Sequence, residues 1–209
     1  MNRSATLSTF SRSRNRGFTL PELAVSLVIV TILTAIAIPS MMNSLRVYQL
    51  NDAAARVSDA LKFTRFEAVR RNKQVNLLLQ QQNIGGILYW SVGTDSDGDG
   101  LIGPTERQQV FTGFATLLPA SGPPTTSITT ALGVGALNTL SGNPGSVTFD
   151  ARGAVRTGPT GPIATNVSVI YVGNANQPQY GFRAVVVLPA GGTQVWMAPP
   201  GTPTWLRIG

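Results

Sequence analysis

The sequence contains no cysteine and no histidine among its 209 residues. Without cysteine there is neither thiol catalysis nor a disulfide, and without both residues there is no Cys/His zinc site. Acid–base mechanisms that depend on histidine are excluded as well. A Ser–Lys or carboxylate enzyme stays open in principle, but no group of residues indicates one. We therefore expect a protein that is not an enzyme.

Acidic residues are few, and the formal net charge of +7 comes largely from one end of the chain. Arg3, Arg12, Arg14 and Arg16 all precede Gly17. Without these four arginines, 12 basic residues face 9 acidic ones, so the rest of the chain carries only +3. A bias this small does not by itself indicate nucleic-acid binding.

A long apolar segment follows the basic stretch. Every residue from 23 to 38 is apolar, small or hydroxylated. With residues 18–20 the segment has about 20 residues, or about 30 Å as a helix, which is enough to cross a bilayer. Because four arginines precede the segment and no charged residue follows it before Arg46, we expect a single-pass protein with a cytoplasmic N-terminus and the C-terminal bulk outside.

One charged residue, Glu22, lies near the start of the apolar segment. A carboxylate costs about 2.5–3.5 kcal/mol at the centre of a membrane-spanning helix and less near its end, so Glu22 needs a partner or the interface. Thr19, three residues earlier, suggests a capping box at the helix start. A cap does not explain why a basic stretch, Gly17, an aromatic residue and Glu22 occur together.

The run Gly17-Phe18-Thr19-Leu20-Pro21-Glu22, followed by an apolar stretch and Pro39, resembles the prepilin cleavage motif of type IV pilins and type II secretion pseudopilins. The resemblance implies that a prepilin peptidase cuts between Gly17 and Phe18 and methylates the new terminal amine of Phe18. Glu22 would then neutralise the terminal amine of a neighbouring subunit. It also implies that Glu22 and Pro39 serve assembly with other pilins or pseudopilins in the inner membrane.

Two other N-terminal fates stay open. A conventional secretory signal places its apolar region before a small-residue cleavage site, and Ala35-Ile36-Ala37 offers that pattern, although Glu22 and the long leader argue against it. The third alternative is an uncleaved membrane anchor. N-terminal sequencing separates the three, because the first residue would be Phe18, Ile38 or Met1.

Beyond the apolar segment a helical pattern continues, so we expect one helix from about residue 20 to residue 72. Pro39 should kink or locally melt it. Apolar or small side chains at alternating spacings of four and three define one face of the second half: Leu50, Ala54, Val57, Leu61, Thr64 and Ala68. Arg70, Arg71 and Lys73 close the segment, where cations suit the negative end of the helix dipole. They form either a solvated helix end or a contact for DNA or a protein partner.

The remainder of the chain predicts a β-rich head. Segments bounded by turn residues indicate strands at 74–81, 87–92, 108–114, 146–150, 167–172, 182–188, 193–197 and 205–208. The nearly continuous apolar run at 182–188 is typical of a strand that is buried on both faces. Residues 115–145 carry almost no charge and predict a long loop, partly ordered by Leu117, Leu118, Ile128 and Leu132. The expected fold class is α+β, a long N-terminal hydrophobic helix packed on an antiparallel β-sandwich.

Within the head, several segments resemble the GspH/FimT branch of minor pilins and pseudopilins. They are residues 67–72 at the helix end, Trp90 before an acidic Gly-rich loop, residues 148–153 and residues 185–189. The resemblance implies a structural subunit of a type II secretion pseudopilus that takes part in protein secretion. The alternative is a minor subunit of a type IV pilus that serves pilus biogenesis or DNA uptake.

Relatives that take up DNA use arginines in the C-terminal part of the head, so the resemblance makes Arg152 and Arg156 candidate DNA contacts here. Many relatives also carry a cysteine pair near the C-terminus, which this chain lacks. The expectations divide the chain into a leader (1–17), a transmembrane and assembly helix (18–38), its amphipathic continuation (39–73) and a periplasmic head (74–209).

An acidic loop follows the second predicted strand and matches the twelve-position calcium-loop pattern. Asp95, Asp97 and Asp99 could each supply one oxygen, Leu101 its backbone carbonyl, and Glu106 both carboxylate oxygens. Asp and Gly also favour turns, and strands flank the segment in place of EF-hand helices, so a plain β-hairpin loop is the alternative. No cofactor is required, and a bound Ca²⁺ would be structural.

Overall fold

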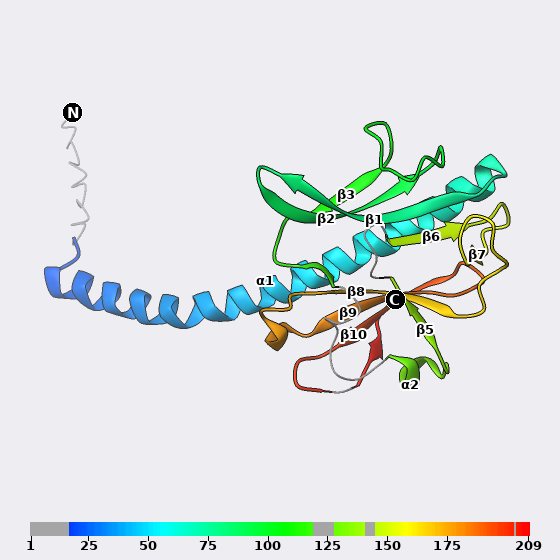
Figure 1. The fold of residues 1–209 in the computed structure, drawn as a ribbon. Coiled ribbons are helices and arrows are strands. Elements are labelled where there is room, and N and C mark those ends of the chain that lie inside the picture. Colours follow the sequence, from blue (N-terminus) through cyan, green and yellow to red (C-terminus); the bar gives the residue numbers. More distant parts are fainter. Residues whose placement is uncertain (1–16, 119–127, 141–144, 203) are drawn as a thin grey trace, which may run out of the picture. The chain divides into compact units, whose positions relative to one another are not determined.

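The computed structural model describes residues 17–118, 128–140, 145–202 and 204–209. The chain divides into two units, Met1–Met42 and Asn43–Gly209, and we call the second unit the head. The helix α1 (Leu20–Arg71) contributes to both units (Figure 1). Its bounds confirm the helix that the apolar pattern predicts.

In the N-terminal unit, every described residue of the chain is exposed. By length and composition, α1 is the one helix in the described part of the chain that could cross a membrane. Its apolar side chains have no core to enter, so they need lipid or another protein around them. A kink or local melting was predicted at Pro39; the helix is continuous through this residue, so the local melting does not occur. Proline removes one backbone donor, and the other helical hydrogen bonds maintain the turn.

The head contains two mainly antiparallel sheets, which together with the long helix give the expected α+β class. The first has the order β3 (Gln108–Phe111), β2 (Ile87–Asp95), β1 (Val75–Ile84), β6 (Gly145–Phe149) and β7 (Val155–Arg156). The second has the order β11 (Leu206–Arg207), β10 (Thr193–Ala198), β9 (Phe182–Val187), β8 (Val167–Gly173) and β4 (Thr116–Leu118). The strand β5 (Leu137–Thr139) pairs with β8 in parallel, and the other pairs are antiparallel.

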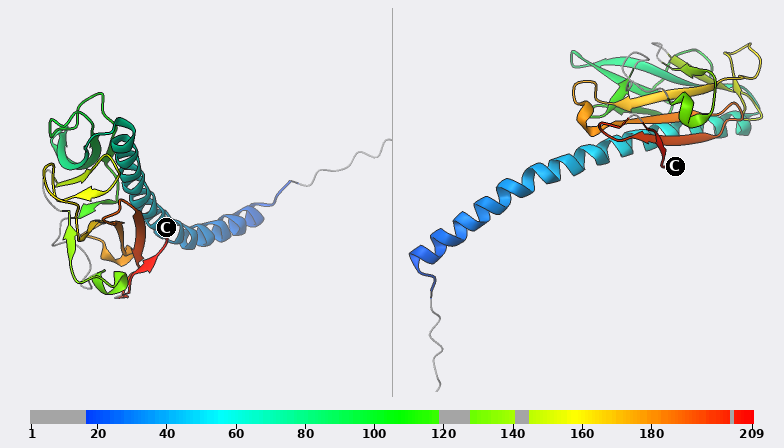
Figure 2. Two further views of the ribbon diagram at one scale, coloured as in Figure 1. Left: turned by 90° about the vertical axis from the view of Figure 1, so that its right-hand side faces the viewer. Right: turned by 90° about the horizontal axis from the view of Figure 1, so that it is seen from below.

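The main core lies between the head part of α1 and the two sheets (Figure 2). The predicted helix face is buried, with Leu50, Val57 and Leu61 fully enclosed. They pack in one cluster with side chains of both sheets, among them Leu77 and Val185. Burying each such side chain contributes about 1.5–3 kcal/mol, so this cluster positions the helix against the strands.

A second cluster covers the other face of the second sheet. It joins residues of β8 and β9, such as Val169 and Val186, to Ile128 and Trp205. All seven residues of β8 and all six of β9 are buried. The prediction that the apolar run at 182–188 forms a strand buried on both faces is therefore confirmed.

Residues 115–145 contain regular structure where a long loop was predicted. Among their described residues are β4, the helix α2 (Thr129–Leu132) and β5; residues 119–127 and 141–144 lie outside the described part. Leu117, Leu118 and Ile128 are buried, and Leu132 packs on the second cluster. Elements of three or four residues are too short to show a period, so the sequence predicted the ordering by these four residues but not the short helix and strands.

Candidate functional site

The residues predicted for processing lie just before α1. Gly17 and Phe18 are in non-helical backbone, and the Phe18 side chain is 82% exposed. A Cβ atom placed on Gly17 would meet no other atom within 4 Å. The backbone at these two residues is therefore exposed, and cleavage between them stays a prediction.

Glu22 lies in the first turn of α1 and is exposed. Its Oε2 atom accepts hydrogen bonds from the backbone N–H and the hydroxyl of Thr19, both at 3.4 Å. The backbone bond is one half of the predicted capping box, and the N–H of Leu23 also donates to the Thr19 carbonyl at 3.1 Å. Distances of 3.4 Å mark weak hydrogen bonds, so Glu22 can accept a stronger donor.

Hydroxyl side chains on the apolar part of α1 are satisfied within the helix. Each donates to the carbonyl four residues earlier, at 2.7–2.8 Å: Ser26 to Glu22, Thr31 to Leu27 and Thr34 to Val30. Unpaired polar groups are costly in hydrocarbon. This arrangement lets the helix present an apolar surface despite its hydroxyl groups.

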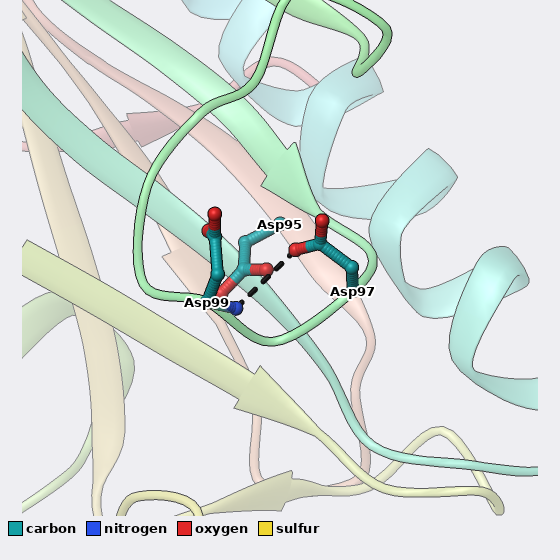
Figure 3. Close-up of side chains that lie close together, drawn as sticks. All are labelled: Asp95, Asp97 and Asp99. Atoms are coloured by element: carbon teal, nitrogen blue, oxygen red, sulfur yellow. Dashed lines mark hydrogen bonds between the residues drawn. The ribbon is translucent and has the colours of Figure 1, made fainter.

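The acidic loop brings three carboxylates together after β2. One oxygen from each of Asp95, Asp97 and Asp99 lies within 4.8 Å of the others. Figure 3 shows the three side chains close together on the loop. Asp95 is buried and accepts hydrogen bonds from Asn76 Nδ2 at 3.1 Å and from the Gly98 N–H at 2.6 Å. Asp97 and Asp99 are exposed, and the Asp99 N–H donates to Asp97 at 3.3 Å. The chemistry of three hard oxygen donors fits Ca²⁺, so a calcium site stays a prediction.

Glu106 is not part of this carboxylate group in the described structure. Its Oε1 atom accepts from the backbone N–H and the hydroxyl of Ser96, and its Oε2 atom accepts from the Gly103 N–H at 2.9 Å. The backbone N–H of Leu101 donates to Asp99 at 2.8 Å. The structure thus gathers three of the four predicted carboxylates and uses the fourth to close the loop.

The arginines predicted to contact DNA border one open cavity of about 430 Å³, together with Lys73 and Asp150. Arg152 is exposed. Arg156 is partly used inside the chain: its Nη1 donates to the Gly161 carbonyl at 2.8 Å, and its Nε lies 3.7 Å from Asp150. The sequence prediction of DNA contact stays a prediction.

At the end of α1, Arg70 and Arg71 are paired within the chain. Both donate to the nearly buried carboxylate of Glu67, each at 2.7 Å, and Arg71 also reaches the Ser96 carbonyl at 3.4 Å. The hydrogen bond from Arg70 lowers the pKa of Glu67 below its ordinary value, against the opposing effect of burial. These two arginines therefore stabilise the helix end and contribute less free charge than the sequence suggests.

Two family models match the chain. The model described as Type II transport protein GspH matches residues 53–191, and the prokaryotic N-terminal methylation motif matches residues 12–38. The chain belongs to the GspH family. Members of this pilin-like family are minor pilins and pseudopilins, which are structural subunits that interact with other pilins in a filament. The resemblance drawn from residues 17–22 and from the head is thereby confirmed.

The solved structures that the chain matches include the type IV minor pilin FimU of Pseudomonas aeruginosa strain PAO1 in two crystal forms. In one, 17% of residues are identical, 74% of this chain and 100% of FimU are covered, and the TM-score is 0.45. In the other, identity is 16%, coverage is 75% and 96%, and the TM-score is 0.47. None of the curated proteins matches the chain.

Two residues with strong local roles in this GspH-family head escaped the sequence analysis. Asp150 is 6% exposed and accepts from the N–H groups of Arg152 and Ala154, both at 2.9 Å. Arg183 is 1% exposed within β9 and donates from Nε to Asn51 Oδ1 on α1 at 2.7 Å. Burial lowers the pKa of the Arg183 guanidinium from its ordinary value. A charged residue inside an apolar run was the signal that could have drawn attention to Arg183.

Proposed function

We propose that this GspH-family chain is a structural subunit of a type II secretion pseudopilus that takes part in protein secretion and has no enzymatic role. The observation that carries the proposal is the pair of family matches on one chain. A head matched by the model described as a type II transport protein follows an N-terminal methylation motif. The two matches support the proposal of a subunit that is processed at its N-terminus and then assembled.

In this proposal the chain enters the inner membrane with its N-terminus in the cytoplasm and its head in the periplasm. A prepilin peptidase cuts between Gly17 and Phe18, and the amine of Phe18 is methylated. The exposed, non-helical backbone at these residues supports cleavage there. The position of four arginines before Gly17 supports the orientation.

Assembly follows from the exposed apolar part of α1. In the filament, the helices of neighbouring subunits pack around one another at the centre. Their apolar side chains are then shielded from water. Glu22 then meets the positively charged amine of a neighbouring Phe18. Such a pair gains strength in a medium of low dielectric constant, and the weak 3.4 Å contacts of Glu22 to Thr19 are easily exchanged for it.

The experiment is complementation of a deletion strain in the native host. Wild type and Asp59→Ala should restore secretion, whereas Glu22→Ala should not, although all three are inserted at equal levels. Asp59 is the matched control because its side chain is 62% exposed and its only ion pair is a 3.6 Å contact with Lys62 within the described residues. Loss of surface pili with normal secretion in the deletion strain would support the type IV pilus alternative. Full activity of Glu22→Ala would contradict the assembly role of Glu22.

A further inference from the structure

The turn between β1 and β2 exposes a small apolar surface, which we call the hairpin tip (residues 84–88). Ile84 is 48% exposed, Ile87 57% and Leu88 64%. Ile84 pairs with Ile87, and the two residues between them, Gly85 and Gly86, have positive φ angles of 62° and 85°. Two consecutive positive φ angles produce a tight two-residue turn. The tip therefore holds its aliphatic side chains on a fixed, narrow end of the hairpin.

The hairpin behind the tip carries no charge. Residues 74–94 include no Asp, Glu, Lys or Arg. Tyr89 and Trp90 follow the tip directly, and both are half-buried. Tyrosine and tryptophan are enriched at the level of lipid headgroups because one part of each ring is apolar and another is polar. Aliphatic residues at the end and aromatic residues behind them match the polarity gradient of a membrane surface.

The position of the tip along the head follows from contacts inside the head. β1 begins after α1 ends and runs back along it (Figure 1). Thr94 on β2 contacts Thr64 on α1, with 2.8 Å between the hydroxyl oxygens. Ile87 lies seven residues before Thr94, about 23 Å along a strand, which corresponds to about 15 residues of helix. The tip is therefore level with α1 near residue 49.

A second contact supports this level. Phe111 on β3 pairs with Trp90 and lines the same cavity as Gln49 and Arg56. Ile87 lies three residues beyond Trp90, toward the start of the head part of the helix. Both contacts place the tip beside the first turns of α1 within the head.

In the proposed function, in which α1 spans the membrane, the membrane surface falls near the same residues of the helix. After Glu22 the next charged residue is Arg46, so residues 23–45 are uncharged. About 20 apolar residues cross the hydrocarbon core, and the rest reach the headgroup layer, where arginine side chains are favourable. Arg46 belongs to the head, and residue 49 is only three residues, about 5 Å, further along the helix.

We propose that the hairpin tip inserts into the lipid headgroup layer while the subunit is anchored in the membrane and not yet assembled. The proposal rests on the proposed function, because it requires α1 to be a membrane anchor. A phospholipid surface is favoured over a second copy of the chain because the tip is uncharged, is followed by Tyr and Trp, and lies at the level where headgroups begin. Ile84, Ile87 and Leu88 provide the contact.

The experiment uses nitroxide labels on the full chain in vesicles of phosphatidylethanolamine and phosphatidylglycerol. Because the sequence has no cysteine, one introduced cysteine gives one label. The positions are Ile87→Cys at the tip, Thr105→Cys as an exposed control beside the last turns of α1, and Thr34→Cys as a control within the anchor. The ratio of accessibility to oxygen over accessibility to a water-soluble nickel chelate reports contact with lipid. A Leu88→Cys label provides a second site at the tip.

The expected result is a severalfold higher oxygen-to-nickel ratio at Ile87 and Leu88 than at Thr105, with the highest ratio at Thr34. Equal ratios at Ile87, Leu88 and Thr105, with a lipid-like ratio at Thr34, would overturn the hairpin proposal and leave the anchor intact. A water-like ratio at Thr34 would instead overturn the membrane anchor of the proposed function. Spin–spin broadening at Ile87 that disappears on dilution with unlabelled protein, without a lipid-like ratio, would assign the tip to a second copy and also overturn the proposal.

Discussion

We expect the substitution Asp150→Ala to lower the free energy of unfolding of the head by about 2–4 kcal/mol. Asp150 is 6% exposed, and one of its carboxylate oxygens accepts from two backbone N–H groups at 2.9 Å. Hydrogen bonds to an ionised group contribute about 1.5–3 kcal/mol each, and two bonds to one oxygen are not fully additive. The substitution leaves the N–H groups of Arg152 and Ala154 without this acceptor.

The assay is thermal unfolding of the full chain in detergent, followed by near-UV circular dichroism. For a domain of this size, 1 kcal/mol corresponds to about 2–4 °C in Tm, so the Tm should fall by roughly 4–16 °C. Asp59→Ala is the control, because its exposed pair with Lys62 should change stability by less than about 1 kcal/mol. A Tm for Asp150→Ala no lower than that of Asp59→Ala would refute the role of the Asp150 turn.

The same comparison has a defined pH dependence. Burial alone would raise the pKa of Asp150, but hydrogen bonds from Ala154 and Arg152 and the charges of Arg156 and Arg152 outweigh it and lower the pKa below the ordinary value of 3.8. Because the pKa is lower in the folded protein, the stabilisation is complete well above 3.8 and is lost as the pH falls through the folded pKa. The Tm difference between wild type and Asp150→Ala should therefore be constant near neutral pH and shrink below pH 3.8.

Three further outcomes are expected. Millimolar Ca²⁺ should raise the Tm and Asp97→Ala should abolish the rise, whereas identical curves with Ca²⁺ and with chelator would rule out the calcium loop. Gly191→Ala should lower the free energy of unfolding by well over 1 kcal/mol, because φ is +82° and the new Cβ would collide with the Gly153 carbonyl. Gly201→Ala, with φ +71° and open space around the new Cβ, should lower it by only about 1 kcal/mol. Equal losses in Tm for the two variants would contradict this packing. If Arg152 contacts DNA, duplex binding by the full chain should weaken with salt and on Arg152→Ala, and binding that neither change affects would reject the contact.

The N-terminal motif could be recognised from the sequence because all its determinants are close together in the chain. Gly17, Phe18 and Glu22 lie within six residues, and the apolar segment after them needs no tertiary partner to be identified. The helix face from Leu50 to Ala68 could be recognised equally well, because its period of 3.6 residues is maintained over about five turns. The longer strands could be predicted because alternating or continuous apolar residues between turn residues are also a local signal.

Features that depend on the path of the chain could not be predicted. Asp95, Asp97 and Asp99 lie together, as their spacing predicts. Glu106 instead accepts hydrogen bonds from Ser96 and Gly103, because the path of the loop brings these groups to its carboxylate. The two-residue strand β7 and the three-residue strands β4 and β5 form only because longer strands beside them offer free backbone groups.

The central claim, a filament subunit made from a processed precursor, is tested most directly by mass spectrometry of the protein purified from its native host. The account predicts one mature form whose first residue is Phe18 carrying an N-methyl group. Protein that still starts at Met1, or that has been trimmed so that Ile38 comes first, would contradict it.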